Sequence, residues 1–277
     1  MSIDSLKFVN IVRDLSVDKG AFIRELAATN PPSRKYIIMF TARSGSTWLT
    51  NVLSGTKLLG TPEEFINPDF VLGVARSLNT KEPAPFLELL QCRRKSPNGV
   101  FGMEVRHIDI ELFGEDVFFK TFGENTVFFN LWRENIVAQA VSLYRAVSSG
   151  RYHSTDNAAP TVPPYDADHI NRWLMHLHLQ ENANIKLLGK RGIIFDNLRY
   201  ETMVKNRETT LELFFDRLGL KDQQKEIETL IATELQKVGD CWNDETEQRF
   251  RAERASSIAE FEDSRLVRKL PPKDIAI

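Results

Sequence analysis

A short polar segment, residues 41–47 (TARSGST), follows the first strongly apolar run of the chain, residues 36–40. The apolar run is typical of a buried strand, and the apolar spacing that begins at Trp48 is typical of a helix. Backbone N–H groups and the dipole at the start of such a helix favour an anion, so this segment could hold a phosphate. An arginine would add charge, hydroxyls would add donors, and a glycine would let the backbone come close. The residues concerned are Arg43, Ser44, Gly45, Ser46 and Thr47.

Two other interpretations of this segment remain open from the residues alone. Its serines and threonines could simply cap a helix, as these residue types often do. An ATP-dependent small-molecule kinase on a related fold could also place phosphates here. The Walker A pattern G-x-x-x-x-G-K-[ST] does not occur in the sequence, however, and neither does a recognisable pattern for Mg²⁺. These two absences count against a kinase.

A second arginine, Arg133, ends another apolar run, residues 126–132, and precedes a helical pattern over 134–149. An arginine can clamp a phosphate with two hydrogen bonds, and Ser142 in the helix could donate beside it. One face of this helix is polar and distinct from its apolar stripe, so that face either looks onto a nucleotide or is solvated. Its members are Asn135, Ala138, Gln139, Ser142 and Arg145.

Adjacent acids, Glu63 and Glu64, lie in the segment 61–65 (TPEEF). A carboxylate can act as a general base toward a hydroxyl, but acids after a proline also suit the start of a helix. The five histidines have no carboxylate or cysteine pair at metal-ligand spacing, and Cys92 and Cys241 lie far apart in the sequence. The sequence therefore predicts neither a metal site nor a disulfide.

The elements that must position these residues alternate between strands and helices. Such alternation favours an α/β fold with a mainly parallel sheet and helices on both faces, whose ligands bind beyond the carboxyl ends of the strands. Residues 1–35 predict an N-terminal helical extension, and residues 150–165 predict a polar loop long enough to be a lid. The apolar runs that predict strands are 36–40, 100–105, 126–132 and 192–195.

Composition and charge narrow the class of protein. The chain has 277 residues, of which 42% are hydrophobic and 27% are charged, and its net charge is −2. These values suit a single α/β domain over residues 1–277, and they argue against a disordered chain or a nucleic-acid binder. No apolar run reaches the roughly 18 residues that cross a bilayer, and the N-terminus has no signal-peptide core. We therefore expect a cytoplasmic protein without a transmembrane segment.

Three of these segments, in this order, resemble motifs of the sulfotransferases that use 3′-phosphoadenosine 5′-phosphosulfate (PAPS), in the form found in the bacterial trehalose 2-sulfotransferase family. Residues 43–47 are similar to the loop that binds the 5′-phosphosulfate. Arg133, followed nine positions later by Ser142, resembles the 3′-phosphate motif, which implies that both residues contact that phosphate. The segment 61–65 is similar to a third motif, which implies that Glu64 is the general base.

The resemblance covers roughly residues 36 to 255. It implies a P-loop-like fold and the transfer of a sulfuryl group from PAPS to a hydroxyl of a carbohydrate, glycolipid or other small acceptor. The product would be 3′-phosphoadenosine 5′-phosphate (PAP), and no metal would be needed. Arg43 would be catalytic by stabilising the charge that grows on the leaving group, while Tyr200 would touch the adenine. We expect Arg199 and Glu201 beside it to form a surface pair. Relatives are often dimers, which implies a homodimer.

The chain departs from the family pattern near the expected acceptor. Glu104 stands where the trehalose enzyme has a lysine, and residues 150–165 share little with the sugar-contacting region of the family. We therefore do not expect trehalose itself as the acceptor. Phe65, Glu104 and His153, together with Glu64, are the residues expected to contact the acceptor. A non-catalytic protein that kept the nucleotide pocket as a binding module remains an alternative.

Overall fold

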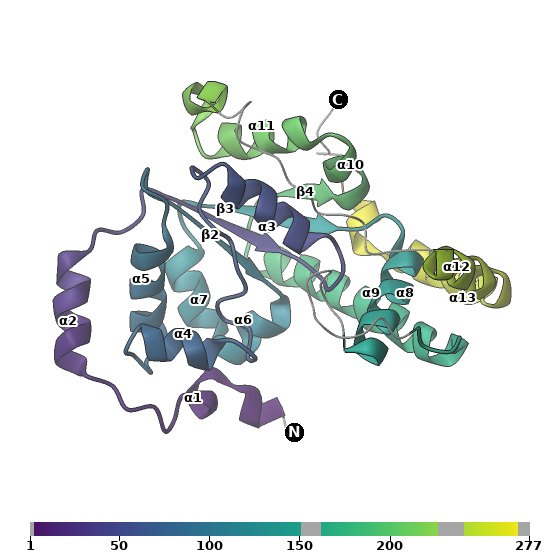
Figure 1. The fold of residues 1–277 in the computed structure, drawn as a ribbon, viewed down its shortest axis with the longest axis horizontal. Helices are drawn as coiled ribbons and strands as arrows, with labels where there is room; N and C mark the ends of the chain where they lie inside the picture. The colour runs from purple at the N-terminus through teal and green to yellow at the C-terminus, as the bar shows by residue number, and fades with distance from the viewer. Residues whose placement is uncertain (1–2, 151–161, 227–240, 271–277) are drawn as a thin grey trace.

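The computed structural model describes residues 3–150, 162–226 and 241–270, and in these residues a four-stranded parallel sheet forms the centre (Figure 1). The strands lie in the order β2-β1-β3-β4. Helices cover both faces of the sheet, which confirms the α/β fold class expected from the sequence. The strands are β1 (Arg34–Met39), β2 (Val100–Val105), β3 (Thr126–Trp132) and β4 (Phe195–Arg199).

The helices fall into three groups, each packed on its own apolar cluster. The first group covers one face of the sheet and comprises α1 (Phe8–Ile11), α4 (Val71–Ser77), α5 (Pro83–Arg94), α6 (His107–Phe113) and α7 (Glu115–Phe122). The second covers the other face and comprises α3 (Ser46–Gly55), α10 (Tyr200–Lys205) and α11 (Arg207–Arg217). The third comprises α8 (Ile136–Ser149), α9 (Ala167–Lys190), α12 (Cys241–Glu253) and α13 (Ala255–Ser264).

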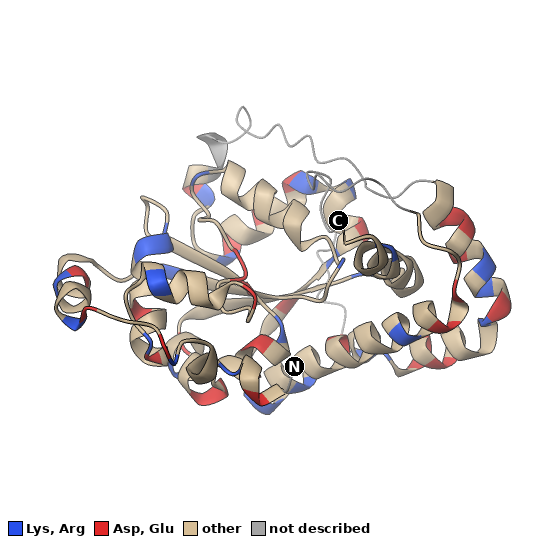
Figure 2. Cartoon of the chain, turned by 60° about the horizontal axis from the view of Figure 1, so that its bottom comes forward, with Lys and Arg blue, Asp and Glu red and all other residues tan. Residues whose placement is uncertain are grey.

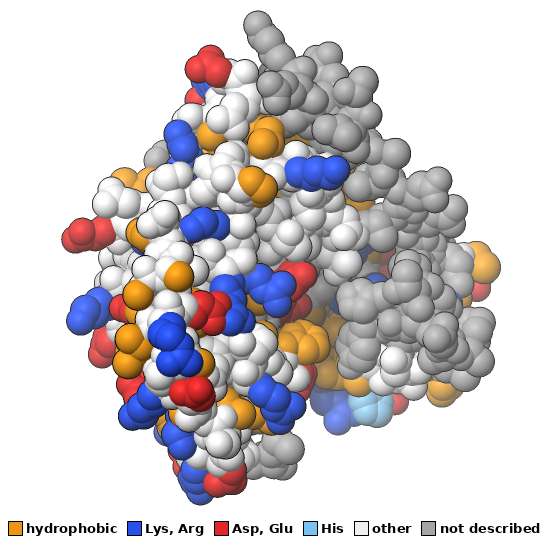
Figure 3. All heavy atoms as spheres, turned by 60° about the vertical axis from the view of Figure 1, so that its left-hand side comes forward, with side chains coloured by type: hydrophobic (Ala, Val, Ile, Leu, Met, Phe, Trp, Pro, Cys, Tyr) orange, Lys and Arg blue, Asp and Glu red, His pale blue; other side chains and the backbone are white. Residues whose placement is uncertain are grey.

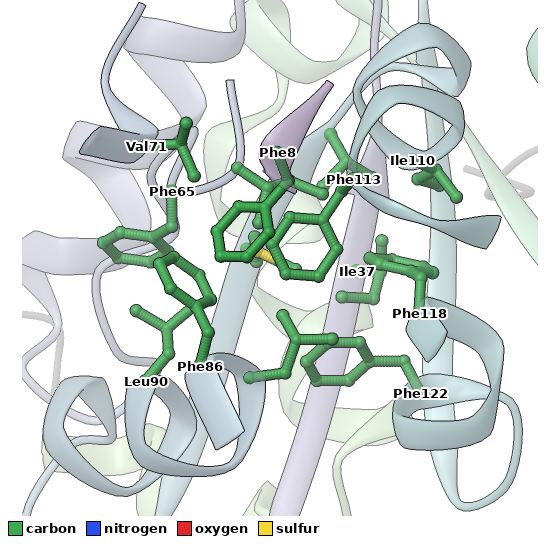
Figure 4. Close-up of a cluster of buried hydrophobic side chains, with 14 of the residues drawn as sticks. Phe8, Ile37, Phe65, Val71, Phe86, Leu90, Ile110, Phe113, Phe118 and Phe122 are labelled. Carbon is green, nitrogen blue, oxygen red and sulfur yellow. The ribbon is translucent and has the colours of Figure 1, made fainter. Parts of the chain in front are cut away.

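The first strand shows why the sequence reads as a continuous apolar run. Ile37 and Met39 pack into the cluster on one face, while Tyr36 and Ile38 pack into the cluster on the other. Because successive side chains of a strand point to opposite faces, a strand covered on both sides needs apolar residues at every position. Figure 4 shows the first cluster, in which phenylalanine rings pack between the helices and one face of the sheet.

The N-terminal extension forms helices, as the sequence predicts. Phe8 of α1 is buried in the first cluster, so this end of the chain belongs to the core. The helix α2 (Lys19–Ala28) lies farther out (Figure 1), and its Glu25 pairs with Arg93 of α5. Figure 3 views the molecule from this side and shows acidic and basic side chains mixed over the surface. The same mixture runs along the helices in Figure 2, as the small net charge leads one to expect.

The fourth strand differs from the prediction of 192–195. It spans Phe195–Arg199 and pairs with β3 from Phe128 to Trp132. Its buried positions include Asp196, which binds Arg217, and Asn197, which accepts a hydrogen bond from Asn130 Nδ2 at 3.0 Å. Ile194, in contrast, is 81% exposed. The apolar run was therefore a misleading guide, because this strand buries polar side chains that have partners elsewhere in the fold.

The direction of the chain connections reverses between β1 and β3. From β1 the chain passes through helices to β2 on one side, and from β3 it passes to β4 on the other side. Loops that leave adjacent strand ends in opposite directions open a crevice at the carboxyl edge of the sheet, where ligands of such folds bind. The segments that leave these two ends are residues 40–45 and 133–135.

Candidate functional site

The segment between β1 and α3 is a tight turn with two residues in the left-handed region. Arg43 has φ 63° and Gly45 has φ 94°. A side chain at Gly45 would put its Cβ 2.3 Å from the ring of Tyr200, so this position requires glycine. The Oγ of Ser44 is buried and has no hydrogen-bond partner within the described part of the chain. Leu49 N–H donates to the Gly45 carbonyl, which leaves the N–H groups at the start of α3 for a ligand.

Side chains from α8 and α9 hold this turn in place. Gln139 Nε2 donates to Thr41 Oγ1 at 2.9 Å and to the Ala42 carbonyl at 2.7 Å. Asn184 Nδ2 donates to the Phe40 carbonyl at 2.9 Å. Gln139 lies on the polar helix face noted in the sequence, but it contacts the backbone of the turn. The turn is therefore held in its shape before any ligand binds.

The carboxyl ends of β1 and β3 bring three of the expected phosphate contacts together. Arg43 Nε donates to Ser142 Oγ at 3.0 Å, and Arg133 Nη1 donates to the Arg43 carbonyl at 3.4 Å. The guanidinium of Arg133 also lies over the Tyr200 ring, 4.7 Å from its centroid. Two guanidinium groups, a hydroxyl and a helix N-terminus thus converge. These donors, with the unpartnered Ser44 Oγ, fit an anionic nucleotide that carries more than one phosphate-type group.

Glu201 fixes the start of α8. Its carboxylate accepts hydrogen bonds from the N–H groups of Glu134 at 3.0 Å and Asn135 at 3.2 Å. Arg199 Nε donates instead to Thr202 Oγ1 at 2.9 Å. The expected surface pair of Arg199 and Glu201 was therefore wrong, because free N–H groups at a helix start are a better partner for the carboxylate.

The acids expected near the acceptor lie beside the carboxyl end of β2. Glu104, at 4% exposure, contacts the hydroxyls of Thr50 and Ser46 on α3. Glu63 accepts the Glu104 N–H through its backbone carbonyl at 3.2 Å, which sets this segment along the strand edge. Glu64 is half-buried, accepts a hydrogen bond from Asn67 Nδ2 at 2.7 Å, and lies close enough to Glu104 to act on its charge.

The Glu104 carboxyl is held in its protonated form. Burial raises its pKa to about 8, and the charges of Glu64 and Glu63 add to the rise. The geometry agrees, since Thr50 Oγ1 lies 2.7 Å from Glu104 Oε1 and 2.8 Å from the Pro62 carbonyl oxygen. One hydroxyl proton can serve only one of these oxygens. A protonated Glu104 that donates to Thr50 leaves the Thr50 proton for Pro62 and satisfies both contacts.

This protonation predicts how stability depends on pH. The folded pKa lies above the ordinary 4.5, so the folded chain keeps a proton that the unfolded chain releases. The free energy of unfolding should therefore fall as pH rises from about 4.5 to about 8, by up to about 1.4 kcal/mol per pH unit, and then level off. Glu104→Gln should remove this slope, which urea unfolding at pH 5, 6.5 and 8 would measure. Glu63→Gln, at an exposed neighbouring side chain, should keep it, and an unchanged slope in Glu104→Gln would contradict the assignment.

Phe65, which was expected to contact the acceptor, does not join this group. Phe65 is buried in the first core cluster, where its ring lies 6.3 Å from that of Phe101. His153 and most of the expected lid over 150–165 lie outside the described residues. Within the residues that are described, no three His, Cys, Asp or Glu side chains are grouped to hold a metal, and no helix is long and apolar enough to span a membrane.

Comparisons with known proteins match this arrangement of motifs. A family model described as Stf0 sulphotransferase matches residues 35–253. A curated trehalose 2-sulfotransferase from Mycobacterium tuberculosis is 24% identical over 259 residues, which covers 79% of this chain and 95% of that protein. The crystal structure of sulfotransferase STF9 from Mycobacterium avium is 12% identical, covers 91% of this chain and 83% of its own, and superposes with a TM-score of 0.52. At that identity, the structural likeness shows a shared fold.

Proposed function

The chain belongs to the Stf0 sulphotransferase family and is a sulfotransferase, and we propose that it moves a sulfuryl group from PAPS to a hydroxyl of a carbohydrate, glycolipid or other small acceptor. One observation carries the choice of PAPS: Arg43, Ser142 and Arg133 meet beside the N-terminus of α3 at the carboxyl ends of β1 and β3. A nucleotide with phosphate groups on two sides of its ribose would use both the turn and the α8 side chains.

Different residues bind the two ends of the nucleotide and stabilise the charge of the leaving group. The backbone of residues 44–47 binds the 5′-phosphosulfate, and Arg43 stabilises the charge that develops on the leaving oxygen. Arg133 and Ser142 bind the 3′-phosphate, while Tyr200 stacks under the Arg133 guanidinium. PAPS supplies the activated sulfuryl group. The transfer itself needs positioning and charge stabilisation more than covalent help, as phosphoryl transfer does.

The acids beside β2 act on the acceptor. Glu64 takes the proton of the acceptor hydroxyl as general base. Glu104, held protonated between Thr50 and Glu64, keeps a neutral carboxyl beside that base, so the acceptor meets one charged and one neutral carboxyl. Such a pair both accepts and donates hydrogen bonds, which suits an acceptor with several hydroxyls. A sulfotransferase relative named for trehalose supports a carbohydrate, although Glu104 argues for a different sugar.

Turnover of labelled PAPS against a panel of sugars, glycolipids and small alcohols tests the activity and the acceptor together. We expect transfer to at least one polyhydroxylated acceptor without added Mg²⁺. If ATP binds only with Mg²⁺ and PAP does not bind, the proposed use of PAPS is wrong. PAP binding without turnover on any acceptor would favour a non-catalytic nucleotide-binding module. The homodimer that the resemblance implies stays a prediction, which sedimentation would test.

Arg133→Ala tests the 3′-phosphate site. The wild type should bind PAP much more tightly than adenosine 5′-monophosphate (AMP), and the variant should lose most of that preference. Hydrogen bonds to a charged group contribute roughly 1.5–3 kcal/mol each, so the loss should be about 10- to 100-fold in PAP affinity. Isothermal titration calorimetry with both nucleotides measures it.

A matched control lies on α8, the helix that follows Arg133. Arg145 of α8 packs over Trp242 and donates a hydrogen bond to Asn243 Oδ1. Arg145→Ala should therefore keep the preference for PAP over AMP. Equal affinity of the wild type for PAP and AMP would refute the assignment of Arg133 and Ser142.

A further inference from the structure

A fully buried arginine, Arg265, contacts the backbone that leads from β3 into α8. It stands at the start of a short 3₁₀ helix (Leu266–Lys269) and is 0% exposed. Its Nη1 donates to the Glu134 carbonyl at 2.8 Å, and its Nη2 donates to the Arg133 carbonyl at 2.5 Å. A fully buried cation bound to these two carbonyls fixes the peptide groups next to the proposed 3′-phosphate contact.

The charge of Arg265 is compensated within the core. Glu181 of α9 accepts from Arg265 Nε at 2.9 Å and from Nη2 at 2.7 Å, and the Trp132 ring lies 5.3 Å from the guanidinium. Burying a cation is unfavourable unless it is paired and fully hydrogen-bonded, and removing either partner leaves a buried charge. Arg265 therefore needs all of its partners: besides Glu181, its Nη groups donate to the two backbone carbonyls, and Glu262 Oε2 lies 3.6 Å from Nη1.

The same backbone segment is held from its amide side as well. Glu201 accepts from the N–H groups of Glu134 and Asn135, while Arg265 donates to the carbonyls of Arg133 and Glu134. A cation on the carbonyls and an anion on the amides leave the segment little freedom to rotate. The Arg133 side chain leaves this fixed backbone and is oriented further by the Tyr200 ring.

We propose that Arg265 is a positioning residue for recognition of the 3′-phosphate, because it fixes the backbone from which the Arg133 guanidinium projects. The inference rests on the proposed function, in which Arg133 contacts that phosphate. Arg265 is buried and acts only through Arg133. It also lies beyond the residues that the family model matches, which end at 253.

Arg265→Lys tests this role. Lysine keeps the charge but has only three donors, all on one nitrogen, so it cannot make the four hydrogen bonds that Arg265 makes to Glu181 and the two carbonyls. We expect PAP affinity to fall about tenfold while AMP affinity changes less than about twofold, so the ratio of the two affinities falls. Calorimetry gives the ratio, and circular dichroism reports folding. Arg268→Lys is the matched control, because Arg268 lies in the 3₁₀ helix that follows Arg265, is exposed, and pairs with the side chains of Glu134 and Glu262.

A measurement on the wild type covers the case in which Arg265→Lys does not fold. Coupling between two sites is reciprocal, so PAP should slow hydrogen exchange at residues 265–267 more than AMP does. The Leu266 N–H, which donates to Asn182 Oδ1 at 2.9 Å, is a suitable probe.

The outcomes distinguish a failure of the proposed function from a failure of the role of Arg265. A wild type without preference for PAP over AMP refutes the proposed function. A wild type with that preference, and a folded Arg265→Lys that keeps it or loses both affinities equally, overturns the role of Arg265 alone. If the variant is unfolded, equal protection by PAP and AMP at residues 265–267 overturns it.

Discussion

Replacing Glu64 with glutamine should nearly abolish sulfuryl transfer while PAP affinity and folding stay unchanged. The amide has almost the same shape as the carboxylate, and it can still pair with Asn67, so packing should hardly change. It cannot accept the proton of the acceptor hydroxyl. Loss of a positioned general base lowers turnover roughly 10²- to 10⁴-fold. Steady-state turnover of labelled PAPS, with calorimetry of PAP binding on the same preparation, measures both quantities.

Glu63→Gln is the control for this experiment. The Glu63 side chain is exposed, and its structural contact with β2 runs through its backbone carbonyl, which the substitution keeps. Its turnover should remain close to that of the wild type. If both variants lose activity to the same small extent, Glu64 is only an acid in a turn, and His153 becomes the next residue to test as the base.

Replacing Arg43 with alanine should lower turnover roughly 10²- to 10³-fold, which is the effect of removing one electrostatic donor from a developing charge. The loss should exceed the loss of PAP affinity, because Gln139 and Asn184 still hold the backbone that binds the 5′-phosphate. Arginine and alanine both carry a Cβ, so the left-handed backbone at position 43 costs about the same free energy in both proteins. The backbone conformation therefore does not bias the comparison. Turnover number and the PAP dissociation constant must be measured separately.

Ser142→Ala gives the opposite signature and serves as the control. It removes the hydroxyl that accepts from Arg43 Nε but leaves the guanidinium in the site. PAP affinity should fall while turnover at saturating PAPS stays nearer to the wild-type value. An Arg43→Ala variant that keeps its turnover number and only binds PAP more weakly would show that Arg43 serves the 3′-phosphate with Ser142 and has no catalytic role.

The sheet could be predicted from the sequence where burial on both faces demands apolar residues. The strands at 100–105 and 126–132 have the predicted bounds, and β1 differs by a residue or two at each end. The fourth strand could not be placed this way, because Asp196 and Asn197 are buried there with partners from β3 and α11. Hydrophobic pattern carries no information about a polar residue whose partner lies far along the chain.

The residues of the candidate site could likewise be predicted only in part. Arg43, Ser142 and Arg133 could be named from local motifs, since each motif lies at a strand end that the pattern already locates. The partners that hold them could not. Gln139 was on the predicted face, but its target was visible only in three dimensions, and Arg265 sits 84 residues from Glu181 in a stretch that reads as a charged surface helix.

The contact between Gly45 and Tyr200 constrains these two positions unequally during evolution. A side chain at position 45 meets two independent obstacles, the Tyr200 ring at 2.3 Å and a φ of 94°. A smaller residue at position 200 meets neither, since glycine leaves the turn as it is. Removing the Tyr200 ring clears only one of the two obstacles, because the left-handed backbone at position 45 still favours glycine. Position 45 is thus the more tightly constrained of the two, because its backbone conformation favours glycine whatever residue stands at position 200.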